Sequence, residues 1–552
     1  MGHIALIAAL ALAAYGDGRD YGRSMVISRQ GIVATSQVLA SQAGARILAR
    51  GGSAVDAAIA ANAVLGVTEP MMDGIGGDLF VLYWDAKTGK LTGLNSSGPA
   101  PRALTREFLA KLGITKMPSA GIHSVTVPGA VRGWAEMHKR FGKLPWKELF
   151  DSAIAYANEG FPVAEGIAEA WDGETARAKL ESHAETARVF LPDGRAPRTG
   201  DIFRNPDLGR SLRLIADQGP DAFYKGEIAK AILKTSRDLG GTMTAEDLAS
   251  FSPEWVTPIS TEYRGWHVYE LPPNVQGMAA LEMLNIMETV PASPEGPLSA
   301  DEMHERIEAM KLAYSDLKRY DADPRFTDVP TRKLISKDYA RRRAELIDPK
   351  KANCDVPPGV PLFGDTTYLT VVDREGNIAS WIQSISALFG SGIVVDGIVL
   401  QNRGAGFTLE AKHPNVLAGG KRPFHTIIPA FAEKGDQHAG FGIMGGPNQP
   451  LAHAQFISNM ADYGMNVQAA LEEPRFTKTS AKGCDVSIES RVPLSTLQQL
   501  SERGHQIRIR KKYTQEMGRG QAILHNSRTK TNYAASDPRA DGAAIPEPVI
   551  HE

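Results

Sequence analysis

Residues 363–386 read FGDTTYLTVVDREGNIASWIQSIS, and this stretch decides how the rest of the chain is interpreted. The run from Thr366 to Val372 is rich in β-branched and aromatic residues, which predicts a strand. Asp373 to Asn377 has the composition of a turn, and Ile378 to Ile385 alternates apolar with small or polar residues, as a returning strand does. The stretch therefore predicts a β-hairpin whose first strand opens on the pair Thr366-Thr367.

A threonine at the start of this strand would become an effective nucleophile if the chain were cut immediately before it. A threonine hydroxyl is weak until a base lies beside it, and a cut before Thr366 would supply the residue's own α-amino group. That amine titrates near neutrality, at about pKa 7.7 to 8.0 in model peptides, so it can accept the hydroxyl proton. The alternative is that the two threonines only open a strand.

The same stretch resembles the segment around the new N-terminus of gamma-glutamyltransferases, a family of N-terminal-nucleophile hydrolases. Similar motifs follow in order from about Arg23 to Asp541. The sequences QNRGAGF at 401–407 and RPFHT at 422–426 are closer to the cephalosporin (glutaryl) acylases and oxamate amidohydrolase within that family. The resemblance implies an α+β fold, an αββα sandwich of two stacked antiparallel sheets between helical layers, which both fragments of one self-cut precursor form together.

The resemblance also divides the chain into three parts. Residues 1–22 precede the family-like region and are interpreted as a signal peptide or an N-terminal extension, 23–365 as the large subunit, and 366–552 as the small subunit that carries the nucleophile. The apolar run Ile4 to Tyr15 is too short to span a bilayer, and Ala11-Leu12-Ala13 could be a cleavage site, although no lysine or arginine precedes the run. We therefore expect a periplasmic or secreted location, with a cytoplasmic one as the alternative.

Further residues complete the catalytic set that the resemblance implies. Ser384 matches a hydroxyl that contacts the nucleophile's amine, and Gly445-Gly446 matches a glycine pair whose N–H groups face the substrate carbonyl oxygen. Glycine suits an oxyanion hole, because close backbone approach is unhindered and two N–H groups can donate. The alternatives are an ordinary strand serine and an ordinary turn. Thr367 points to the opposite face of its strand from Thr366 and is expected to be structural.

Several residues that bind substrate in glutathione-cleaving relatives are replaced here. A serine pair becomes His425-Thr426, and the Gln and Asp that hold the α-amine become Arg403 and Gly406. The stretch that matches the large-subunit arginine, residues 95–99, reads NSSGP, and Arg102 lies further on without a clear assignment. Without the Asp, the site has lost the charge that pairs an ammonium group, and a buried unpaired charge is costly.

The replacements favour a different acyl group. Arg403 and His425 could hold a carboxylate on a substrate that has no α-amine, and Thr426 and Ser386 join them as candidate substrate contacts. The alternatives are that Arg403 only braces a loop and that His425 is a core histidine with its hydrogen bonds satisfied.

Composition excludes several other classes of protein. The chain has 552 residues, 43% of them hydrophobic and 22% charged, with a net charge of −2, which gives no case for a nucleic-acid partner. Cys354 and Cys484 form at most one bridge, and no histidine pair has metal-ligand spacing joined to a third ligand. We therefore expect no metal or other cofactor, and no membrane span.

Local patterns predict other elements. Helices are expected over Gln37–Arg50, over Ala54–Leu65 with Ser53 as its cap, and over Asp301–Tyr320, and one strand is expected over Glu262–Leu271. Pro357-Pro358-Gly359 predicts a loop with the slack that a scissile bond requires.

The function predicted from these residues is acyl transfer from a small amide to water or an amine, with hydrolysis favoured over transpeptidation. Thr366 would act as nucleophile and, through its freed amine, as base. One rival is ordinary glutathione or γ-glutamyl hydrolysis and transpeptidation with rearranged contacts. A rival from another class is a catalytically silent relative that has become a binding protein.

Overall fold

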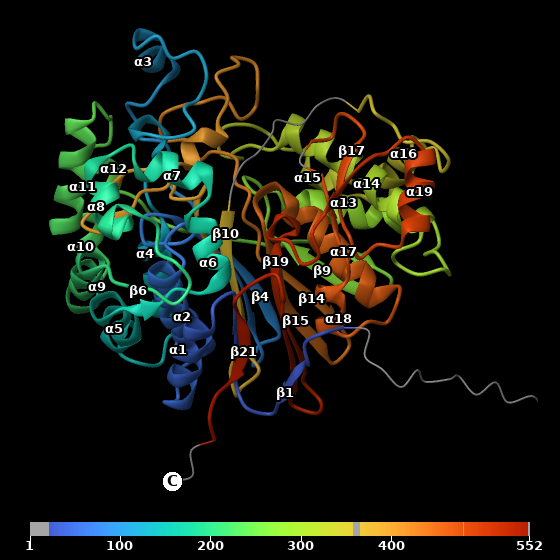
Figure 1. Cartoon of the computed structure of the whole chain (residues 1–552), viewed down its shortest axis with the longest axis horizontal. Coiled ribbons are helices and arrows are strands. Elements are labelled where there is room, and N and C mark those ends of the chain that lie inside the picture. Colours follow the sequence, from blue (N-terminus) through green and yellow to red (C-terminus); the bar gives the residue numbers. More distant parts are fainter. Residues whose placement is uncertain (1–20, 357–364, 479, 550–552) are drawn as a thin grey trace, which may run out of the picture.

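The computed structural model describes residues 21–356, 365–478 and 480–549. The loop predicted at 357–359 and most of the N-terminal segment 1–22 lie outside the described residues. Figure 1 shows two sheets in the middle of the molecule, with helices on both outer sides. The predicted αββα sandwich is therefore confirmed.

The first sheet contains the hairpin quoted above. It has seven antiparallel strands within the described residues, and β10 and β11 lie at its centre. In spatial order its strands are β21 (Ala543–Pro546), β2 (Ile32–Thr35), β10 (Asp365–Val372), β11 (Ile378–Ser386), β3 (Asp78–Asp85), β4 (Lys90–Ser96) and β7 (Glu254–Val256). The strand that begins at the proposed cut is thus flanked by β2, from before the cut, and β11, from after it.

The second sheet packs face to face on the first. It too has seven antiparallel strands among the described residues. In spatial order they are β1 (Val26–Ser28), β20 (Thr531–Ser536), β19 (Arg519–Asn526), β15 (Gln437–Met444), β14 (Ala430–Lys434), β9 (Trp266–Glu270) and β8 (Ile259–Tyr263). This sheet also mixes strands from both sides of residue 365.

Helices from residues 38–249 cover the outer face of the first sheet, on the left in Figure 1. The longer ones are α1 (Val38–Ala49), α2 (Ala54–Thr68), α4 (Ala130–Phe141), α5 (Asp151–Glu159), α9 (Pro206–Gln218) and α11 (Glu227–Asp238). The shorter ones are α6 (Glu165–Trp171), α7 (Glu174–Leu180), α8 (Ala184–Phe190), α10 (Asp221–Tyr224) and α12 (Ala245–Ala249). Helix α3 (Arg106–Lys111) is an exception and lies at the top in Figure 1, in a separate small apolar cluster.

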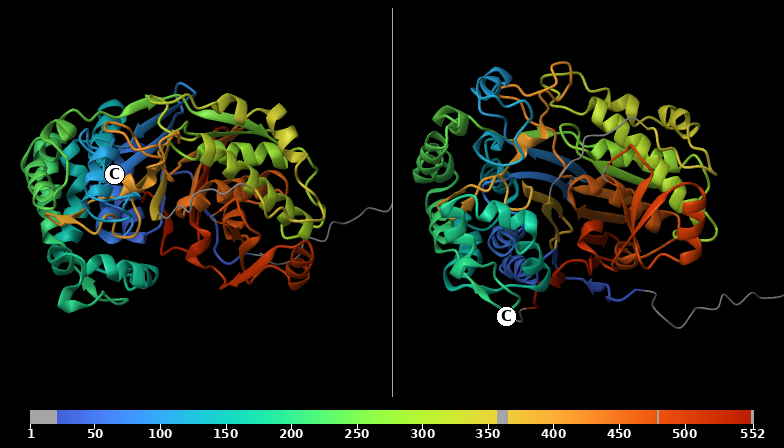
Figure 2. Two further views of the ribbon diagram at one scale, coloured as in Figure 1. Left: turned by 90° about the horizontal axis from the view of Figure 1, so that it is seen from above. Right: turned by 45° about the horizontal axis from the view of Figure 1, so that its top comes forward.

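The remaining helices cover the outer face of the second sheet, on the right in Figure 1. They are α13 (Gly277–Met287), α14 (Ala300–Tyr320), α15 (Thr331–Leu334), α16 (Lys337–Ala344), α17 (Gln449–Ala461), α18 (Val467–Glu472) and α19 (Leu494–Glu502). Three small sheets complete the structure: β5 (Phe161–Pro162) with β6 (Ile202–Phe203), β12 (Val394–Val395) with β13 (Ile398–Val399), and β16 (Phe476–Thr477) with β17 (Asp485–Glu489) and β18 (Gln506–Arg510). The two views of Figure 2 show the same separation of the two helical layers.

Strand β10 shows how the layers are held together. Tyr368 and Val372 point into the apolar layer between the two sheets, whereas Leu369 and Val371 point into the layer between the first sheet and its helices. All four side chains are buried. Fully burying a side chain of this kind stabilises the fold by about 1.5–3 kcal/mol, so the alternation fixes which face of the strand meets which layer.

The two sheets are in close contact where β15 crosses β10. A Cβ atom at Gly442 would lie 2.5 Å from the ring of Tyr368, and one at Gly440 would lie 2.6 Å from Oγ1 of Thr370. Only glycine fits at such distances, so these two residues set the alignment of β15 against β10.

The structure confirms the predicted helices and contradicts the predicted strand. The helices are confirmed as α1, α2 and α14, and Ser53 caps α2 in a reciprocal capping box with Asp56. The single strand expected over Glu262–Leu271 is wrong. The chain turns at Arg264-Gly265, both with positive φ (50° and 83°), and forms the hairpin of β8 and β9. Arg-Gly is not among the usual residue pairs for such a turn, which is why the sequence did not reveal it.

Cys354 and Cys484 form a disulfide, with their Cα atoms 4.9 Å apart. The sequence allowed one bridge without showing that the two residues meet. The bridge joins a residue before the proposed cut to one after it. No helix within the described residues combines the length and the apolar character needed to cross a bilayer.

Candidate active site

Thr366 lies near the start of β10, on the face that meets the second sheet. Its side chain is fully buried, and its Oγ1 is 3.4 Å from Oγ of Ser384 on β11. The ladder between the two strands is irregular here, because Asp365 pairs with Ser386 whereas Thr367 pairs with Gln383. A bulge of this kind re-aims side chains and is common beside active sites.

The bulge places Ser386 in an unusual backbone conformation. Its φ is +81°, in the left-handed region that residues with a side chain rarely adopt. Its N–H group donates to Oγ of Ser384 at 2.8 Å. The irregular backbone opposite the proposed scissile bond therefore helps to hold the serine beside Thr366.

Thr367 points away from Thr366, as predicted. Its hydroxyl donates to Oδ2 of Asp73 at 2.8 Å, on the side of the first sheet that faces α2. Asp73 is buried and also accepts from Asn62, Gln383 and the N–H of Gly74. Burial raises the pKa of Asp73 to about 7, and these hydrogen bonds oppose the rise. Thr367 thus anchors the beginning of β10 to the segment before β3.

Arg403 joins Ser384 to Thr426. It belongs to a short 3-10 helix, Arg403–Gly406, and is 2% exposed. Nη2 donates to Oγ of Ser384 at 3.0 Å and Nη1 donates to Oγ1 of Thr426 at 2.9 Å. Burial lowers the pKa of Arg403 to about 10, and Asp78 counteracts the fall, so the side chain stays protonated at neutral pH.

His425 lies behind Arg403. Its ring is fully buried, and Nε2 is 2.9 Å from Oδ2 of Asp78, whose Oδ1 accepts from the N–H groups of Gly98 and Gly129. Burial, with Arg403 as a further cause, lowers the pKa of His425 well below its usual range, so the ring is neutral and donates from Nε2. Burial raises the pKa of Asp78 to about 7. The histidine is in contact with Asp78, and it is absent from the cavity wall on which Arg403 lies.

Gly445 and Gly446 follow β15 and lead into α17. Both have positive φ, 142° and 58°, a conformation that only glycine adopts readily. Gln276 links this turn to the segment of Thr426. Its Nε2 donates to the carbonyl oxygen of Gly446 at 2.8 Å and also to the carbonyl oxygen of Thr426. Gly440 packs against Thr370 and Gly442 packs against Tyr368. Along β15 toward its end, the contacts on β10 therefore move toward Thr366.

A cavity of about 930 Å³ opens beside this cluster. Arg403, Thr426 and Ser386 line it, which brings three of the predicted substrate contacts to one cavity. Within the part of the chain that the structure describes, Thr366 is not among the lining residues.

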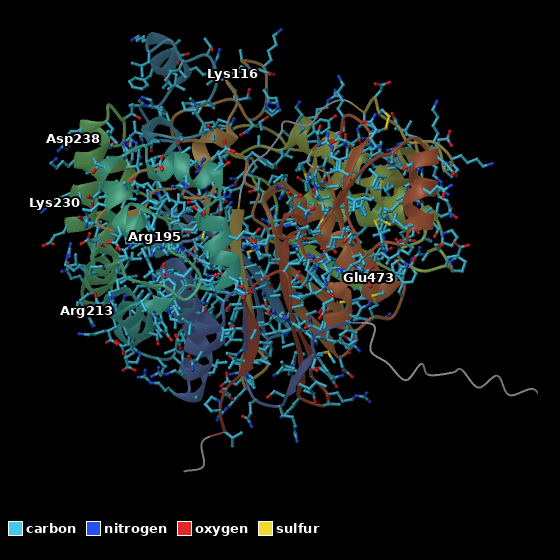
Figure 3. All side chains as sticks on the ribbon, viewed as in Figure 1. Lys116, Arg195, Arg213, Lys230, Asp238 and Glu473 are labelled. Atoms are coloured by element: carbon cyan, nitrogen blue, oxygen red, sulfur yellow. A yellow bond between two sulfur atoms is a disulfide. The ribbon has the colours of Figure 1, made fainter. Side chains whose placement is uncertain are left out.

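Among the described residues, the cavity wall carries more basic than acidic side chains. Besides Arg403 it includes Lys116, Lys179 and Lys318, against Asp321 and Glu410. Figure 3 shows Lys116 at the top of the molecule. Nζ of Lys179 donates to two backbone carbonyls, and burial lowers the pKa of Lys179 to about 8. This charge distribution suits an anionic occupant.

Other residues considered in the sequence lie apart from this cluster. Arg102 is exposed and pairs with Glu246 at 3.5 Å, so it does not take the place of the large-subunit arginine. Sequence analysis did not identify Asp78 as a partner of His425. The three lysines of the cavity wall carry no local signature that could have identified them.

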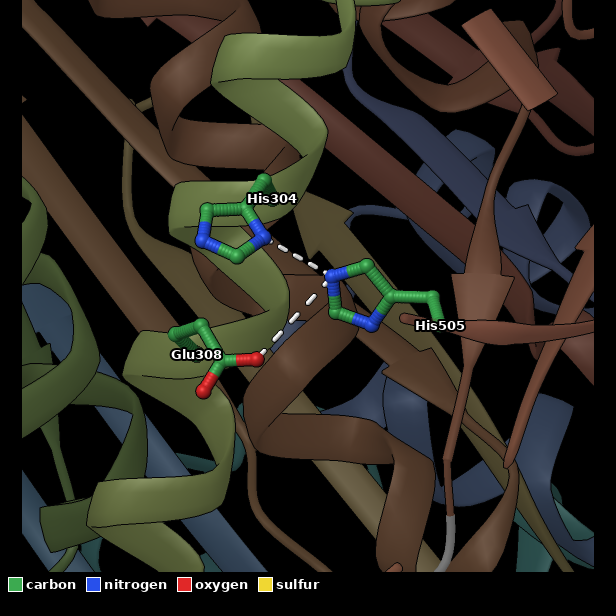
Figure 4. Close-up of side chains that lie close together, drawn as sticks. All are labelled: His304, Glu308 and His505. Atoms are coloured by element: carbon green, nitrogen blue, oxygen red, sulfur yellow. Dashed lines mark hydrogen bonds and ion pairs between the residues drawn. The ribbon is translucent and has the colours of Figure 1, made fainter. Parts of the chain in front are cut away.

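Sequence spacing also missed a buried cluster of His304, Glu308 and His505, shown in Figure 4. His304 donates from Nε2 to the carbonyl of Asp348, so its Nδ1 accepts from Nε2 of His505 at 2.8 Å. Nζ of Lys311 donates to Glu308 at 2.7 Å. A metal ion here would face the buried ammonium of Lys311, which already neutralises Glu308. The cluster is therefore best described as a hydrogen-bonded link between α14 and the residues after α19.

Comparisons with known proteins extend over nearly the whole chain. The family model described as gamma-glutamyltranspeptidase matches residues 40–547. The glutathione hydrolase-like YwrD proenzyme of Bacillus subtilis is 37% identical over 94% of this chain and 99% of its own length, and the oxamate amidohydrolase proenzyme of Klebsiella pneumoniae is 33% identical over 94% and 98%. The crystal structure of cephalosporin acylase from Bacillus halodurans is 42% identical, with a TM-score of 0.89 over 96% of this chain and 98% of that one.

Proposed function

The chain belongs to the gamma-glutamyltranspeptidase family, and from that membership we propose that it is a self-processing amidohydrolase or acyltransferase. Its substrate would be a small amide whose acyl half carries a carboxylate. The observation that carries the proposal is the hydroxyl of Thr366 beside Ser384, at a bulge in the strand that starts at the proposed cut. Three relatives with the names proenzyme or acylase support it.

Self-cleavage would use the hydroxyl of Thr366 as an internal nucleophile. Oγ1 attacks the carbonyl carbon of Asp365, the C–N bond breaks, and the acyl group moves from nitrogen to oxygen as an ester. Water then hydrolyses the ester and leaves a free carboxylate on Asp365 and a free amine on Thr366. The step needs no reactant other than water. It would yield fragments 1–365 and 366–552, which together form each of the two large sheets.

Turnover would use the same hydroxyl with the freed amine as its base. The amine accepts the proton from Oγ1, which attacks the substrate carbonyl, and the N–H groups of Gly445 and Gly446 stabilise the negative oxygen. The proton passes to the departing amine, and water or another amine resolves the acyl-enzyme. An oxyanion donor of this kind contributes on the order of 3–4 kcal/mol to the rate in other hydrolases.

Recognition of a carboxylate is supported by the charges on the cavity wall. Arg403 is buried and protonated, and two of its nitrogens already donate to Ser384 and Thr426. Each of these nitrogens carries a second hydrogen, so a carboxylate can accept from both in a fork. Lys116, Lys179 and Lys318 add positive charge around the same space. His425 would act on the substrate only through Asp78 and Arg403.

A second candidate function is hydrolysis or transpeptidation of γ-glutamyl compounds, including glutathione. It is favoured by the relative named glutathione hydrolase-like, which is 37% identical to this chain. The two candidate functions use the same nucleophile and differ in whether the acyl half of the substrate carries an α-ammonium group.

An exported location also belongs to the proposal, since a disulfide between Cys354 and Cys484 persists best in an oxidising compartment.

Matched anilides test the proposal. Purified protein would be assayed on glutaryl, γ-glutamyl and butyryl p-nitroanilides and on oxamate, with Thr366→Ala as the inactive control. The glutaryl anilide, which has the carboxylate and lacks the ammonium, should be cleaved fastest of the three anilides. A tenfold preference for the γ-glutamyl anilide would establish the second candidate instead. A chain that is not cut and hydrolyses none of these amides would instead support the alternative that the protein is a catalytically silent binding protein.

A further inference from the structure

Asp321, the residue after α14, is a buried acid whose carboxyl group has no hydrogen-bond partner among the described residues. It is 2% exposed, and neither Oδ1 nor Oδ2 has a hydrogen bond within the part of the chain that the structure describes. Asp323, two residues later, is a nearby acid whose carboxylate does have partners. It pairs with Arg325 at 2.6 Å and accepts from the N–H of Arg422 at 2.8 Å. Most buried polar groups in proteins are hydrogen-bonded, so the exception at Asp321 calls for an explanation.

The position of Asp321 at the end of α14 offers an explanation for its unpaired carboxyl group. Tyr314, Leu317 and Lys318 line the 930 Å³ cavity, and Asp321 follows them on the same face with helical spacing and lines it as well. Asp321 therefore lines the same cavity as Arg403 and Thr426. The cavity lining thus includes a residue whose carboxyl group has no hydrogen bond within the described part of the chain.

Its surroundings favour the neutral form of the Asp321 carboxyl group. Burial of an ionised carboxylate without a cation or hydrogen-bond donor is costly, and among the described residues no ion pair includes Asp321. Burial, and then the negative charge of Asp323, raise the pKa of Asp321 well above its usual range. A neutral carboxyl has one O–H group to donate and does not repel an anion.

We propose that protonated Asp321 donates a hydrogen bond to a carboxylate or carbonyl oxygen of the substrate, and so acts as a specificity-determining residue of the cavity. The inference rests on the proposed function, because it places an anionic amide in this space. Arg403 and the three lysines supply charge, whereas Asp321 supplies a directed, uncharged donor. A hydrogen bond to an ionised acceptor is about twice as strong as one between neutral groups.

The opposite assignment makes a different prediction. An ionised Asp321 could pair with an ammonium group of the substrate, as in a γ-glutamyl compound. That pairing needs the negative charge, and an asparagine cannot supply it. A donor role needs only a hydrogen on a polar atom, and asparagine keeps one in the same place. The two roles are therefore separated by a single isosteric substitution.

The test measures binding, so that it does not depend on turnover. Glutarate would be titrated by calorimetry into the wild type and into Asp321→Asn, Asp321→Ala and Glu410→Gln, each checked for self-cleavage on a gel. Glu410→Gln is the matched control, because it removes an exposed carboxyl from the same wall. Asp321→Leu, of similar size to the aspartate, replaces the alanine variant if that one does not fold.

We expect Asp321→Asn to bind glutarate within about twofold of the wild type and Asp321→Ala to bind it about 10- to 100-fold more weakly. Glu410→Gln should bind glutarate at least as tightly as the wild type, because it removes a negative charge from the cavity wall. Equal weakening in the Asn and Ala variants would overturn the proposal, since the ionised form would then be needed. Wild-type affinity in the Ala or Leu variant would overturn it too, as would a wild type that binds no glutarate. Failure of self-cleavage or amidase activity would instead count against the proposed function.

Discussion

Nη2 of Arg403 donates a hydrogen bond of 3.0 Å to Oγ of Ser384, which in turn lies 3.4 Å from Oγ1 of Thr366. A single hydroxyl therefore separates a buried positive charge from the proposed nucleophile. Arg403 also lines the cavity, so one side chain contacts both the proposed substrate site and the proposed catalytic serine. Substitutions at this arginine are expected to affect binding and chemistry together.

Self-cleavage before Thr366 is expected to leave two fragments that remain covalently joined. Cys354 lies in residues 1–365 and Cys484 in residues 366–552, and the two form a disulfide. A denaturing gel should show one band without reductant and two bands with it, and the smaller fragment should begin Thr-Thr-Tyr-Leu-Thr. Cys484→Ser should give two bands in both lanes. A fully active protein that stays one band after reduction would rule out the mechanism.

The two adjacent threonines are expected to have separable roles. Thr366→Ala should remain a single chain without activity, whereas Thr366→Ser, which keeps a hydroxyl, should still be cut. Thr367→Ala should be processed but be less stable by about 1–3 kcal/mol, because the buried carboxylate of Asp73 loses a donor. Denaturant titration and gel analysis of the three variants check this. If Thr367→Ala alone prevented cleavage, the nucleophile would be the wrong threonine.

Arg403→Ala is expected to lower kcat/KM for glutaryl p-nitroanilide by about 10- to 100-fold, the effect of losing a charge-assisted hydrogen bond. Hydrolysis of the butyryl anilide, which has no carboxylate for the arginine to hold, should fall much less. Thr426→Val serves as the control, because it removes only the partner of Nη1. Equal losses on both substrates would mean that the arginine acts through Ser384. Unchanged kinetics would remove Arg403 from the site.

His425→Ala is expected to destabilise the protein more than it impairs substrate binding. The substitution leaves Oδ2 of Asp78 without its donor in a fully buried place, which costs about 1–3 kcal/mol and more for a charged group. Urea unfolding should show the loss, and KM should rise less than in Arg403→Ala. Unchanged stability with a large rise in KM would instead place His425 against the substrate, as the sequence predicts.

Asp321→Asn is expected to stabilise the protein increasingly as the pH rises. The pKa of this carboxyl is raised by folding, so the wild type loses stability from about pH 4, where the unfolded chain begins to release the proton, up to the folded pKa. The gain for asparagine should grow by up to about 1.4 kcal/mol per pH unit within that window and vanish in acid. The neighbouring charged residues Asp323 and Lys318 are present in both the wild type and Asp321→Asn, so the difference between the two unfolding curves reports on Asp321. Unfolding curves whose difference does not change between pH 4 and 8 would contradict the expectation.

The sequence predicted elements whose cause is local. The hairpin of β10 and β11 follows from alternation and a turn, and the start of α2 follows from Ser53, whose capping box needs only neighbouring residues. The order of the motifs was sufficient to identify the family and hence the sandwich. The turn at Arg264-Gly265 was missed because an arginine with positive φ carries no turn signal.

Contacts between distant residues could not be predicted. Asp78 and His425 are 347 positions apart, and only the stacking of the layers brings the histidine behind Arg403 instead of into the cavity. The meeting of Cys354 with Cys484 and the unpaired carboxyl of Asp321 on the cavity wall are likewise properties of the folded chain. Residue types alone suggested what could bind a carboxylate, and they did not show which of those residues face the same space.

The position of β10 between β2 and β11 has a consequence for biosynthesis. The ribosome makes β2 early and β11 only after the proposed scissile bond, and the edge strand β21 comes at the very end of the chain. A nascent chain that stops before residue 386 would lack the partner strand that positions Ser384. Maturation would thus wait until β11 has been made and paired with β10, and the appearance of the smaller fragment in a cell would report that this part of the fold has formed.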